Sequence, residues 1–237
     1  MNDRLKGRRA VITGAGSGIG LATAARLRAD GATVWAVDRA GDVDQQIDVT
    51  APGASEAIIA GARAGLGGVD TVLPFAGIVR STPLTLDDDA DWDATIAVNL
   101  TAVWRLVRAA RTDLEAVPNG RVVLIASVMA SFGSPELAAY VASKHGVIGL
   151  ARSLAAALGP FGTTVNCIQP GAIETPMTEA LFAPGQPGGA FWREKSALKR
   201  LGKAADIADV AAFLCSDDAR FMSGHGIFVD GASTNTP

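Results

Sequence analysis

Few residues of this chain are equipped for chemistry, and two of them stand one helical turn apart. The single tyrosine among 237 residues, Tyr140, lies at position i and Lys144 at position i+4. Because residues at this spacing share one face of a helix, we expect the phenol and the ammonium group to project into one site. A free phenol has a pKa of ~10, and a neighbouring cation favours its ionised form. Lowering that pKa to ~7 requires roughly 4 kcal/mol of differential stabilisation, which Lys144 and a second positive group would have to supply.

Other acid–base machinery is scarce. The chain has two histidines, His145 and His225, which leave almost nothing for a Ser-His-Asp triad or a histidine-bound metal, so we expect no metal site. The two cysteines, Cys167 and Cys215, stand in apolar stretches and are expected to be free, buried thiols in a reducing compartment. Acid–base chemistry is therefore assigned to Tyr140.

A glycine-rich string separates the first predicted strand from the first predicted helix. It reads Thr-Gly-Ala-Gly-Ser-Gly-Ile-Gly over residues 13–20. In this context glycines let the backbone turn tightly and approach a pyrophosphate, which the amino end of the helix stabilises. The string lacks the Gly-Lys-Ser/Thr ending of a nucleoside-triphosphate loop. It predicts dinucleotide contacts at Gly14, Ser17, Gly18, Ile19 and Gly20.

An acidic residue, Asp38, follows the second predicted strand about 20 residues beyond the glycine-rich string. A carboxylate at this place can accept hydrogen bonds from the hydroxyls of an adenosine ribose. Its charge would repel a 2′-phosphate, which favours NAD over NADP. Arg39 is the one basic neighbour that a phosphate would attract, and no basic residue lies within the string itself.

Short apolar runs alternate with longer Ala- and Leu-rich segments along the chain. Strands are predicted at 9–13, 33–37, 47–49, 69–75, 121–126, 163–168 and 226–229, and helices at 18–30, 54–64, 89–99, 101–116, 134–158 and 204–215. Strands that are apolar throughout are typical of a parallel sheet buried on both faces. The alternation predicts an α/β fold, a Rossmann-type doubly wound parallel sheet of about seven strands with helices on both faces.

Composition sets the broad class. Nearly half of the residues are hydrophobic, enough for one well-filled domain over 1–237. The 21 basic and 24 acidic residues leave a net charge of −3, which argues against nucleic-acid binding. The apolar run after the N-terminal charges is too short for a signal peptide, and none approaches the ~20 residues of a membrane span. We expect a cytoplasmic protein with no membrane or nucleic-acid partner.

Together, the motifs resemble those of the short-chain dehydrogenase/reductase family, in its compact single-domain branch. The likeness covers 8–231 in the family's order. It implies a Rossmann-type fold, a nicotinamide cofactor and four catalytic residues. Asn99 would hold a water of a proton relay, Ser127 at the end of the strand before Tyr140 would orient and polarise the substrate oxygen, and Tyr140 would be the acid/base. Lys144 would lower the pKa of Tyr140, aided by an oxidised nicotinamide ring, and bind the nicotinamide ribose.

The resemblance also implies further cofactor contacts. Besides Tyr140 and Lys144, they are Asp48 and Val49 at the adenine, the backbone of Ala76 and Gly77, and Pro170, Gly171, Ile173 and Thr175 at the nicotinamide end. One departure stands out. The family usually has Asn-Asn-Ala-Gly after the fourth strand, and this chain has Pro74-Phe75 in place of the two asparagines. We expect local repacking around Phe75 without loss of catalysis.

A substrate pocket is predicted near a Pro- and Gly-rich stretch. The stretch, residues 183–190, is interpreted as a mobile loop that belongs to a lid, and it lies within a substrate-loop segment at about 176–200. Ser127 and Tyr140 would contact the reacting oxygen, and Met129, Phe132, Phe182 and Trp192 would line apolar walls. The predicted substrate is a small molecule, mainly apolar or cyclic, that carries a secondary alcohol or ketone.

Three functions follow as hypotheses. The first is an NAD-dependent oxidoreductase that interconverts a secondary alcohol and a ketone by hydride transfer, with Tyr140 as acid/base. The second is a β-ketoacyl thioester reductase, for which a row of Arg105, Arg108 and Arg111 is the only hint of a docking face for an acidic carrier. The third is an NAD-sensing binding protein without catalysis. The resemblance also implies a homotetramer, formed through the two long helices.

Overall fold

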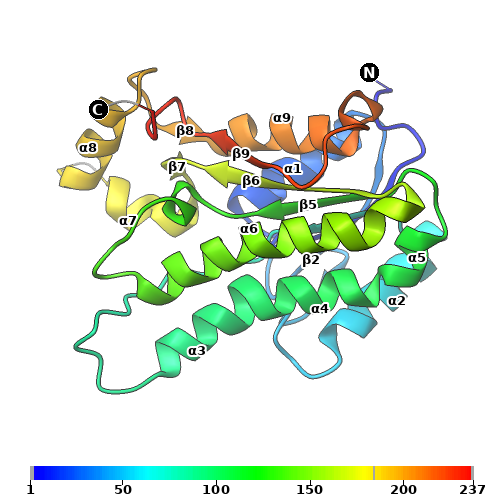
Figure 1. Cartoon of the computed structure of the whole chain (residues 1–237), viewed down its shortest axis with the longest axis horizontal. Coiled ribbons are helices and arrows are strands. Elements are labelled where there is room, and N and C mark those ends of the chain that lie inside the picture. The colour runs from blue at the N-terminus through cyan, green and yellow to red at the C-terminus, as the bar shows by residue number, and fades with distance from the viewer. Residues whose placement is uncertain (1–2, 184, 236–237) are drawn as a thin grey trace.

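The computed structural model describes residues 3–183 and 185–235, and its centre is a seven-stranded parallel sheet (Figure 1). The strands stand in the order β3-β2-β1-β4-β5-β6-β9. They span β1 Arg9–Thr13, β2 Thr33–Asp38, β3 Gln45–Gln46, β4 Thr71–Pro74, β5 Arg121–Ile125, β6 Thr164–Pro170 and β9 Gly226–Val229. The order runs outward from β1 in one direction and from β4 in the other. This confirms the predicted doubly wound, Rossmann-type sheet.

Helices cover both faces of the sheet (Figure 1). α1 (Gly18–Ala29) and α9 (Ala204–Cys215) pack together on one face, and α2 (Ala54–Leu66), α4 (Ala102–Ala109) and α6 (Ala138–Leu158) lie on the other. The shorter elements are α3 Ala90–Ile96, η1 Ala97–Thr101, α5 Arg111–Glu115, η2 Val128–Ala130, η3 Gly159–Phe161, η4 Pro176–Thr178, α7 Glu179–Phe182, α8 Pro187–Lys195 and η5 Asp217–Ala219. At the edge where the strands end, α7 and α8 stand beside the sheet.

Each face of the sheet carries its own apolar core. Ile12 and Leu73 belong to the core under α1 and α9, whereas their neighbours Val11 and Val72 belong to the core under α2, α4 and α6. Successive strand side chains point to opposite faces, and here both faces are covered. This double burial explains why the strands are apolar throughout.

The third strand lies two residues before its predicted place at 47–49. Gln45 and Gln46 pair with the end of β2, and the side chain of Asp44 accepts a hydrogen bond from the backbone N of Ala36 at 2.7 Å. Ile47 and Val49 follow this short strand and pack against the core on the α2 side. Their apolar character reflects burial in that core rather than membership of the strand.

The long helix α6 begins at Ala138 rather than at the predicted residue 134. The backbone N of Ala139 donates to Oγ1 of Thr82 at 3.0 Å, and the backbone N of Thr82 donates to the O of Glu136 at 2.8 Å. Thr82 thus caps the helix from a distant part of the chain. Such a cap leaves no local sequence signal. The prediction relied on the Ser-Pro-Glu string at 134–136 instead and placed the start of the helix too early.

Two connections are more regular than predicted. The sequence predicts a break between two helices near residue 100. The chain instead continues through the π-helical turn Ala97–Thr101, which joins α3 to α4. The segment at 176–200, expected as a mobile loop, contains α7 and α8, and α8 begins with Pro187, whose missing N–H costs no helical bond there. Pro184 of that segment lies outside the described residues. A two-stranded sheet of β7 (Ile173–Glu174) and β8 (Gly202–Lys203), which the sequence did not indicate, joins its two ends.

Candidate active site

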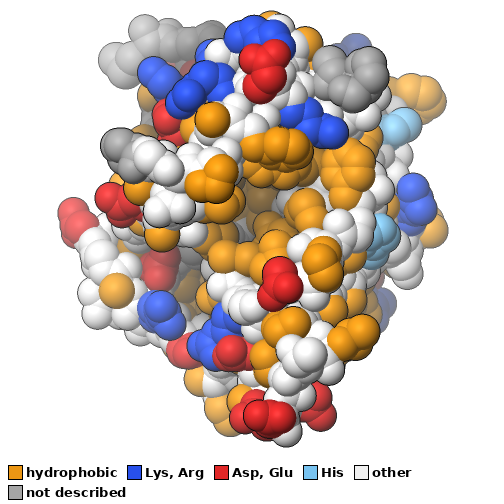
Figure 2. Space-filling model, turned by 90° about the vertical axis from the view of Figure 1, so that its left-hand side faces the viewer, with side chains coloured by type: hydrophobic (Ala, Val, Ile, Leu, Met, Phe, Trp, Pro, Cys, Tyr) orange, Lys and Arg blue, Asp and Glu red, His pale blue; other side chains and the backbone are white. Residues whose placement is uncertain are grey.

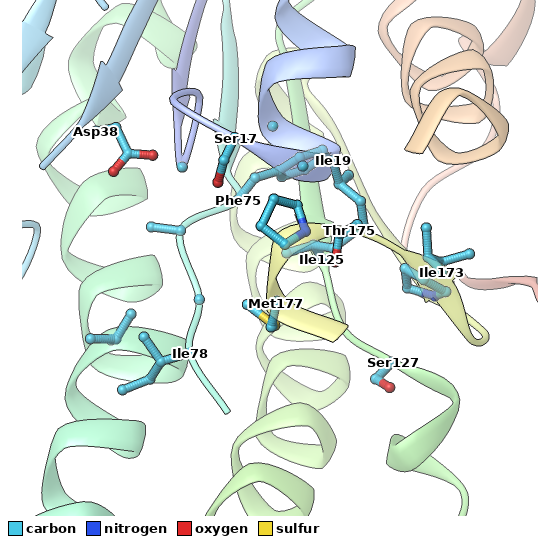
Figure 3. A pocket seen from close by; sticks show the side chains of 18 of the residues that line it. Ser17, Ile19, Asp38, Phe75, Ile78, Ile125, Ser127, Ile173, Thr175 and Met177 are labelled. Carbon is cyan, nitrogen blue, oxygen red and sulfur yellow. The ribbon is translucent and has the colours of Figure 1, made fainter. Parts of the chain in front are cut away.

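A cleft of about 300 Å³ opens at the edge where the parallel strands end. Its walls come from the carboxyl ends of β1, β2, β4, β5 and β6 and from the segment after β6. Figure 2 views the molecule from this edge and shows a hollow with a largely apolar visible lining. In Figure 3, Asp38 and Ser127 lie at opposite ends of the cleft, with Thr175 and Met177 between them. The cleft occupies the crevice where doubly wound sheets bind ligands.

Three glycines of the first loop stand where no side chain fits. A Cβ on Gly14 would lie 2.7 Å from the backbone N of Ala76, and one on Gly20 would lie 1.9 Å from the O of Gly14. A Cβ on Gly16 would lie 2.3 Å from the O of Ala40. These close approaches press the loop against the ends of β4 and β2. The loop therefore borders the cleft at the amino end of α1, where the helix dipole favours an anion.

Two carboxylates border the same half of the cleft. Asp38 accepts hydrogen bonds from the backbone N of Gly16 at 2.9 Å and of Arg39 at 2.6 Å. Asp48 accepts from the backbone N of Thr50 at 2.8 Å and from its Oγ1 at 2.6 Å, and these bonds hold the pKa of Asp48 below its ordinary value. A carboxylate so held keeps lone pairs for the hydroxyls of a sugar. The glycine cradle and Asp38 therefore fit the pyrophosphate and ribose of a dinucleotide.

The side chains of Tyr140, Lys144 and Ser127 meet in the other half of the cleft. Nζ of Lys144 lies 5.5 Å from the ring centroid of Tyr140 and donates a hydrogen bond to the O of Ile125 at 3.0 Å. The hydroxyl of Ser127 accepts from the backbone N of Met129 at 3.1 Å, and its interaction with the phenol of Tyr140 lowers the pKa of that phenol. The spacing of one helical turn thus places phenol and ammonium in one site, as predicted.

Burial is the main cause of the pKa shifts of Tyr140 and Lys144. It raises the pKa of Tyr140, and the interaction with Ser127 opposes that rise. Lys144 is 4% exposed, and burial lowers its pKa to about 8 because the charged form loses its hydration. Lys144 is not among the groups that lower the pKa of Tyr140 here, which differs from the expectation. The phenol is therefore neutral at pH 7 and can donate a proton.

Asn99 lies behind the cleft, in the π-helical turn, and is 1% exposed. Its Oδ1 accepts from the backbone N of Ile78 at 2.9 Å, and its Nδ2 donates to the O of Ile78 at 2.9 Å and to Oγ of Ser143 at 3.3 Å. Ser143 donates in turn to the O of Tyr140 at 2.7 Å. Both N–H groups of the side-chain amide already donate hydrogen bonds. The water that Asn99 is predicted to hold would therefore have to donate to one of its oxygens.

Phe75, the second residue of the departure noted in the sequence, lines the cleft, whereas Pro74 does not. Pro74 ends β4, and Phe75 is 8% exposed and packs in the core under α1 and α9. The backbone N of Phe75 donates to the O of Leu73 at 3.0 Å, and that of Ala76 donates to Oγ1 of Thr13 at 3.3 Å. The backbone is thus satisfied without asparagine side chains, which agrees with the expected local repacking.

All predicted cofactor residues line this cleft. They are Gly14, Ser17, Gly18, Ile19, Gly20, Asp38, Asp48, Val49, Ala76, Gly77, Tyr140, Lys144, Pro170, Gly171, Ile173 and Thr175. Arg39 and Phe75, which the sequence reasoning discussed without assigning them to the site, also line the cleft, and so do residues that it missed: Ile47, Ile78, Val98, Ile125, Ala126, Pro176, Met177 and Thr178. Most of these stand one or two positions from a predicted residue, and that adjacency is the only signal that could have found them.

The predicted apolar substrate wall lies elsewhere. Met129, Phe132, Phe182 and Trp192 do not line the cleft, although Ser127 and Tyr140 do. Trp192 borders a second cavity of about 230 Å³, which shares Ile173 with the first. The ring of Phe132 lies 5.8 Å from Nζ of Lys195 on α8. The apolar side chains that line the cleft include Ile78, Val98 and Met177 instead, and Phe182 and Trp192 lie on α7 and α8.

Other candidates supply no further chemistry. Cys167 and Cys215 are buried and unpaired, and burial raises the pKa of each thiol to about 12. Within 3–183 and 185–235, no three His, Cys, Asp or Glu side chains are grouped to hold a metal ion. In the same ranges, no helix is long and apolar enough to cross a membrane.

The arginine row forms salt bridges with glutamates. Arg108 pairs with Glu56 at 3.7 Å and Arg111 pairs with Glu115 at 2.5 Å.

Known proteins resemble the chain over nearly its whole length. The family model described as enoyl-(acyl carrier protein) reductase matches residues 14–234. The chain is 36% identical to 3-oxoacyl-(acyl-carrier-protein) reductase FabG of Escherichia coli, over 95% of this chain and 97% of that one. Among solved structures, ligand-free aldohexose dehydrogenase of Thermoplasma acidophilum has a TM-score of 0.92 at 28% identity and covers 100% of this chain and 98% of its own. Gluconate 5-dehydrogenase of Burkholderia cenocepacia, solved with NADP and tartrate, has a TM-score of 0.92 at 30% identity, with the same coverage.

Proposed function

The chain belongs to the short-chain dehydrogenase/reductase family, oxidoreductases of CH–OH and keto groups, and from this premise we propose that it interconverts a ketone and a secondary alcohol with NAD(H). One observation carries the proposal: Ser127, Tyr140 and Lys144 converge in the cleft whose other half is the glycine cradle. A bound nicotinamide would supply the hydride for reduction or take it up in oxidation. The protein supplies the proton and the orientation.

The proposed roles follow from the protonation states. In reduction, the neutral phenol of Tyr140 donates its proton to the substrate oxygen while the carbonyl carbon gains the hydride. In oxidation, the phenolate takes the proton back from the alcohol. Ser127, which lines the same half of the cleft, would hold the same oxygen. The ammonium of Lys144, close to the ring, would hold the nicotinamide ribose and stabilise the phenolate as it forms.

We propose NAD rather than NADP as the cofactor. The support is Asp38, whose carboxylate is held in place by the amides of Gly16 and Arg39 and would repel a 2′-phosphate. Two observations favour NADP instead. The side chain of Arg39 also borders the cleft, and the gluconate 5-dehydrogenase relative was solved with NADP.

For the substrate, we propose a 3-oxoacyl thioester as the first class to test. The support is the 36% identity to a 3-oxoacyl-(acyl-carrier-protein) reductase over nearly the whole chain. The apolar walls of Ile78, Val98 and Met177 suit an acyl chain. The second class is a free apolar or cyclic ketone or alcohol. It is favoured by the pairing of Arg108 and Arg111 with glutamates, which leaves Arg105 as the one member of that row without an acidic partner among the described residues.

We also propose that the protein forms a homotetramer through α4 and α6. Ala142 and Gly149 on α6 are exposed, and a Cβ on Gly149 would meet nothing within 4 Å. Trp104 on α4 is exposed as well. Exposed small residues on α6 allow a second copy to approach closely, and an exposed aromatic ring on α4 offers it apolar surface. Light scattering tests this assembly, and a monomer at micromolar concentration would refute it.

Absorbance at the NADH band tests the proposed reaction. Acetoacetyl-CoA with NADH or NADPH represents the thioesters. Cyclic ketones, secondary alcohols and aldonic acids represent the alternatives. We expect oxidation of NADH with acetoacetyl-CoA, and loss of that signal in Ser127→Ala. Turnover of cyclic ketones alone would favour the second substrate class. No turnover of any class, with NADH still bound, would favour an NAD-sensing protein.

A further inference from the structure

One side-chain atom contacts two of the four residues expected at the nicotinamide end, Ile173 and Thr175. Oγ1 of Thr178 lies 2.6 Å from the O of Ile173 and 3.1 Å from the backbone N of Thr175. It also lies 3.2 Å from Oγ1 and 3.1 Å from the O of Thr175. Thr178 itself lines the cleft. The sequence motifs gave no role to this residue.

The donor and acceptor capacity of a hydroxyl decides which of these contacts Thr178 donates to and which it accepts from. Thr178 has one hydrogen to donate, and the short distance to the O of Ile173 makes that carbonyl its acceptor. Its lone pairs accept from the backbone N of Thr175. The backbone N of Thr178 donates to the side chain of Thr175, so the two threonines cap the turn Pro176–Thr178 reciprocally. Thr175 is thus held in extended backbone, with φ −150° and ψ 165°.

This turn is the part of the chain that spans the cleft. A Cβ on Gly18 would lie 3.4 Å from the Cβ of Thr175, so the turn packs on the glycine-rich loop. In Figure 3, Thr175 and Met177 stand between the loop with Ile19 and the end with Ser127. Ile173 is separately fixed by its pairing with Gly202. Thr175 has no such strand pairing, so its position depends on Thr178.

We propose that Thr178 is a positioning residue for the nicotinamide half of the cofactor. Its hydroxyl fixes Ile173 and Thr175 at the distance that the bound dinucleotide requires, and it has no part in holding the adenosine half. The inference rests on the proposed nicotinamide-dependent function. It predicts a split in affinity between ligands that contain the nicotinamide and ligands that end at the ribose before it.

Thr178→Val removes the hydroxyl and keeps the shape, and Thr178→Ser keeps the hydroxyl. Thr33→Val is a matched control. Thr33 is exposed on β2 and its Oγ1 donates to the O of Arg8 at 3.1 Å, at the strand ends opposite the cleft. Kd is measured by calorimetry for NADH and for ADP-ribose, which lacks the nicotinamide. The Tm of each variant is measured without ligand.

We expect Thr178→Val to weaken NADH binding about tenfold, as for the loss of one hydrogen bond in a partly buried site. Its ADP-ribose affinity should stay within about twofold of the parent's, and its Tm should match that of Thr33→Val. Thr178→Ser should restore NADH binding. Equal weakening of both ligands, or unchanged NADH affinity in Thr178→Val, would overturn the inference. Failure of the parent protein to bind either ligand would instead refute the proposed function.

Discussion

The side-chain amide of Asn99 pairs with both backbone polar groups of Ile78, at 2.9 Å each. The pairing resembles one rung of a sheet, made between a side chain and the backbone. It holds the segment after β4 against the π-helical turn, and with Ser143 it links that turn to the helix that carries Tyr140. The geometry on either side of the cleft therefore depends on one buried amide.

Asn99→Ala should destabilise the protein, because it leaves the N–H and the C=O of Ile78 without partners. We expect a loss of about 2–4 kcal/mol in the free energy of unfolding, measured by urea denaturation. Asn119→Ala is the control, since Asn119 is exposed and only its backbone O forms a hydrogen bond. Equal stability of the two variants would show that the pairing contributes nothing.

Asp38→Ala should erode the preference for NAD. The substitution removes the negative charge beside Gly16 and the acceptor proposed for the ribose hydroxyls. We expect the ratio of kcat/KM for NAD to kcat/KM for NADP to fall about 10–100-fold, in line with the loss of hydrogen bonds to a charged group. Asp42→Ala, an exposed carboxylate on the next turn, should leave the ratio unchanged. An unchanged ratio in Asp38→Ala would remove this residue from the ribose site.

The two directions of the reaction should respond oppositely to pH. Burial raises the pKa of Tyr140, so the phenol is protonated at pH 7 and the base needed for oxidation is scarce. The value of kcat/KM for NAD reports ionisations of the free enzyme, and it should climb about tenfold from pH 7 to pH 8, before Lys144 loses its charge. Reduction needs the protonated phenol and should be flat over pH 6–8. An oxidation profile that is already level at pH 7 would contradict the raised pKa.

Lys144→Met should stabilise the fold while it removes activity. The pKa of Lys144 falls to about 8 in the folded protein from its ordinary value of 10.5, so burial of its charge costs stability below pH 8 and this cost disappears by pH 10.5. We expect a gain on the order of 1–3 kcal/mol at pH 7 that shrinks between pH 8 and pH 10.5. Lys6→Met, at an exposed lysine, should show no such trend. Lower stability of Lys144→Met at pH 7 would contradict the burial cost.

The sequence predicted most of the sheet because burial on both faces leaves a local signature. β1 lies at its predicted residues for this reason, and β9 and α9 also lie at theirs. The prediction from sequence failed where a contact with a distant part of the chain decides the local structure. The start of α6 is set by Thr82, and β3 is set by the end of β2 and by Asp44.

The same distinction, between local sequence signals and distant contacts, separates the predictable from the unpredictable parts of the candidate site. Residues in ordered motifs, such as Tyr140 with Lys144, have a fixed spacing on one element and were predictable. The apolar wall depends on where α7 and α8 carry Phe182 and Trp192, and no local spacing reports that. The pKa of Tyr140 was also beyond prediction from a pair of residues, because burial in the folded protein raises it.

Tyr140→Phe is the most direct test of the central claim, that this chain transfers hydride with Tyr140 as its acid/base. The variant loses one hydroxyl and keeps the ring beside Lys144. The measurement pairs NADH binding by fluorescence titration with turnover of whichever substrate the parent enzyme uses. We predict an NADH Kd within about threefold of the parent's and a loss of kcat on the order of 10²–10⁴-fold. Turnover of Tyr140→Phe at the parent's rate would contradict the account.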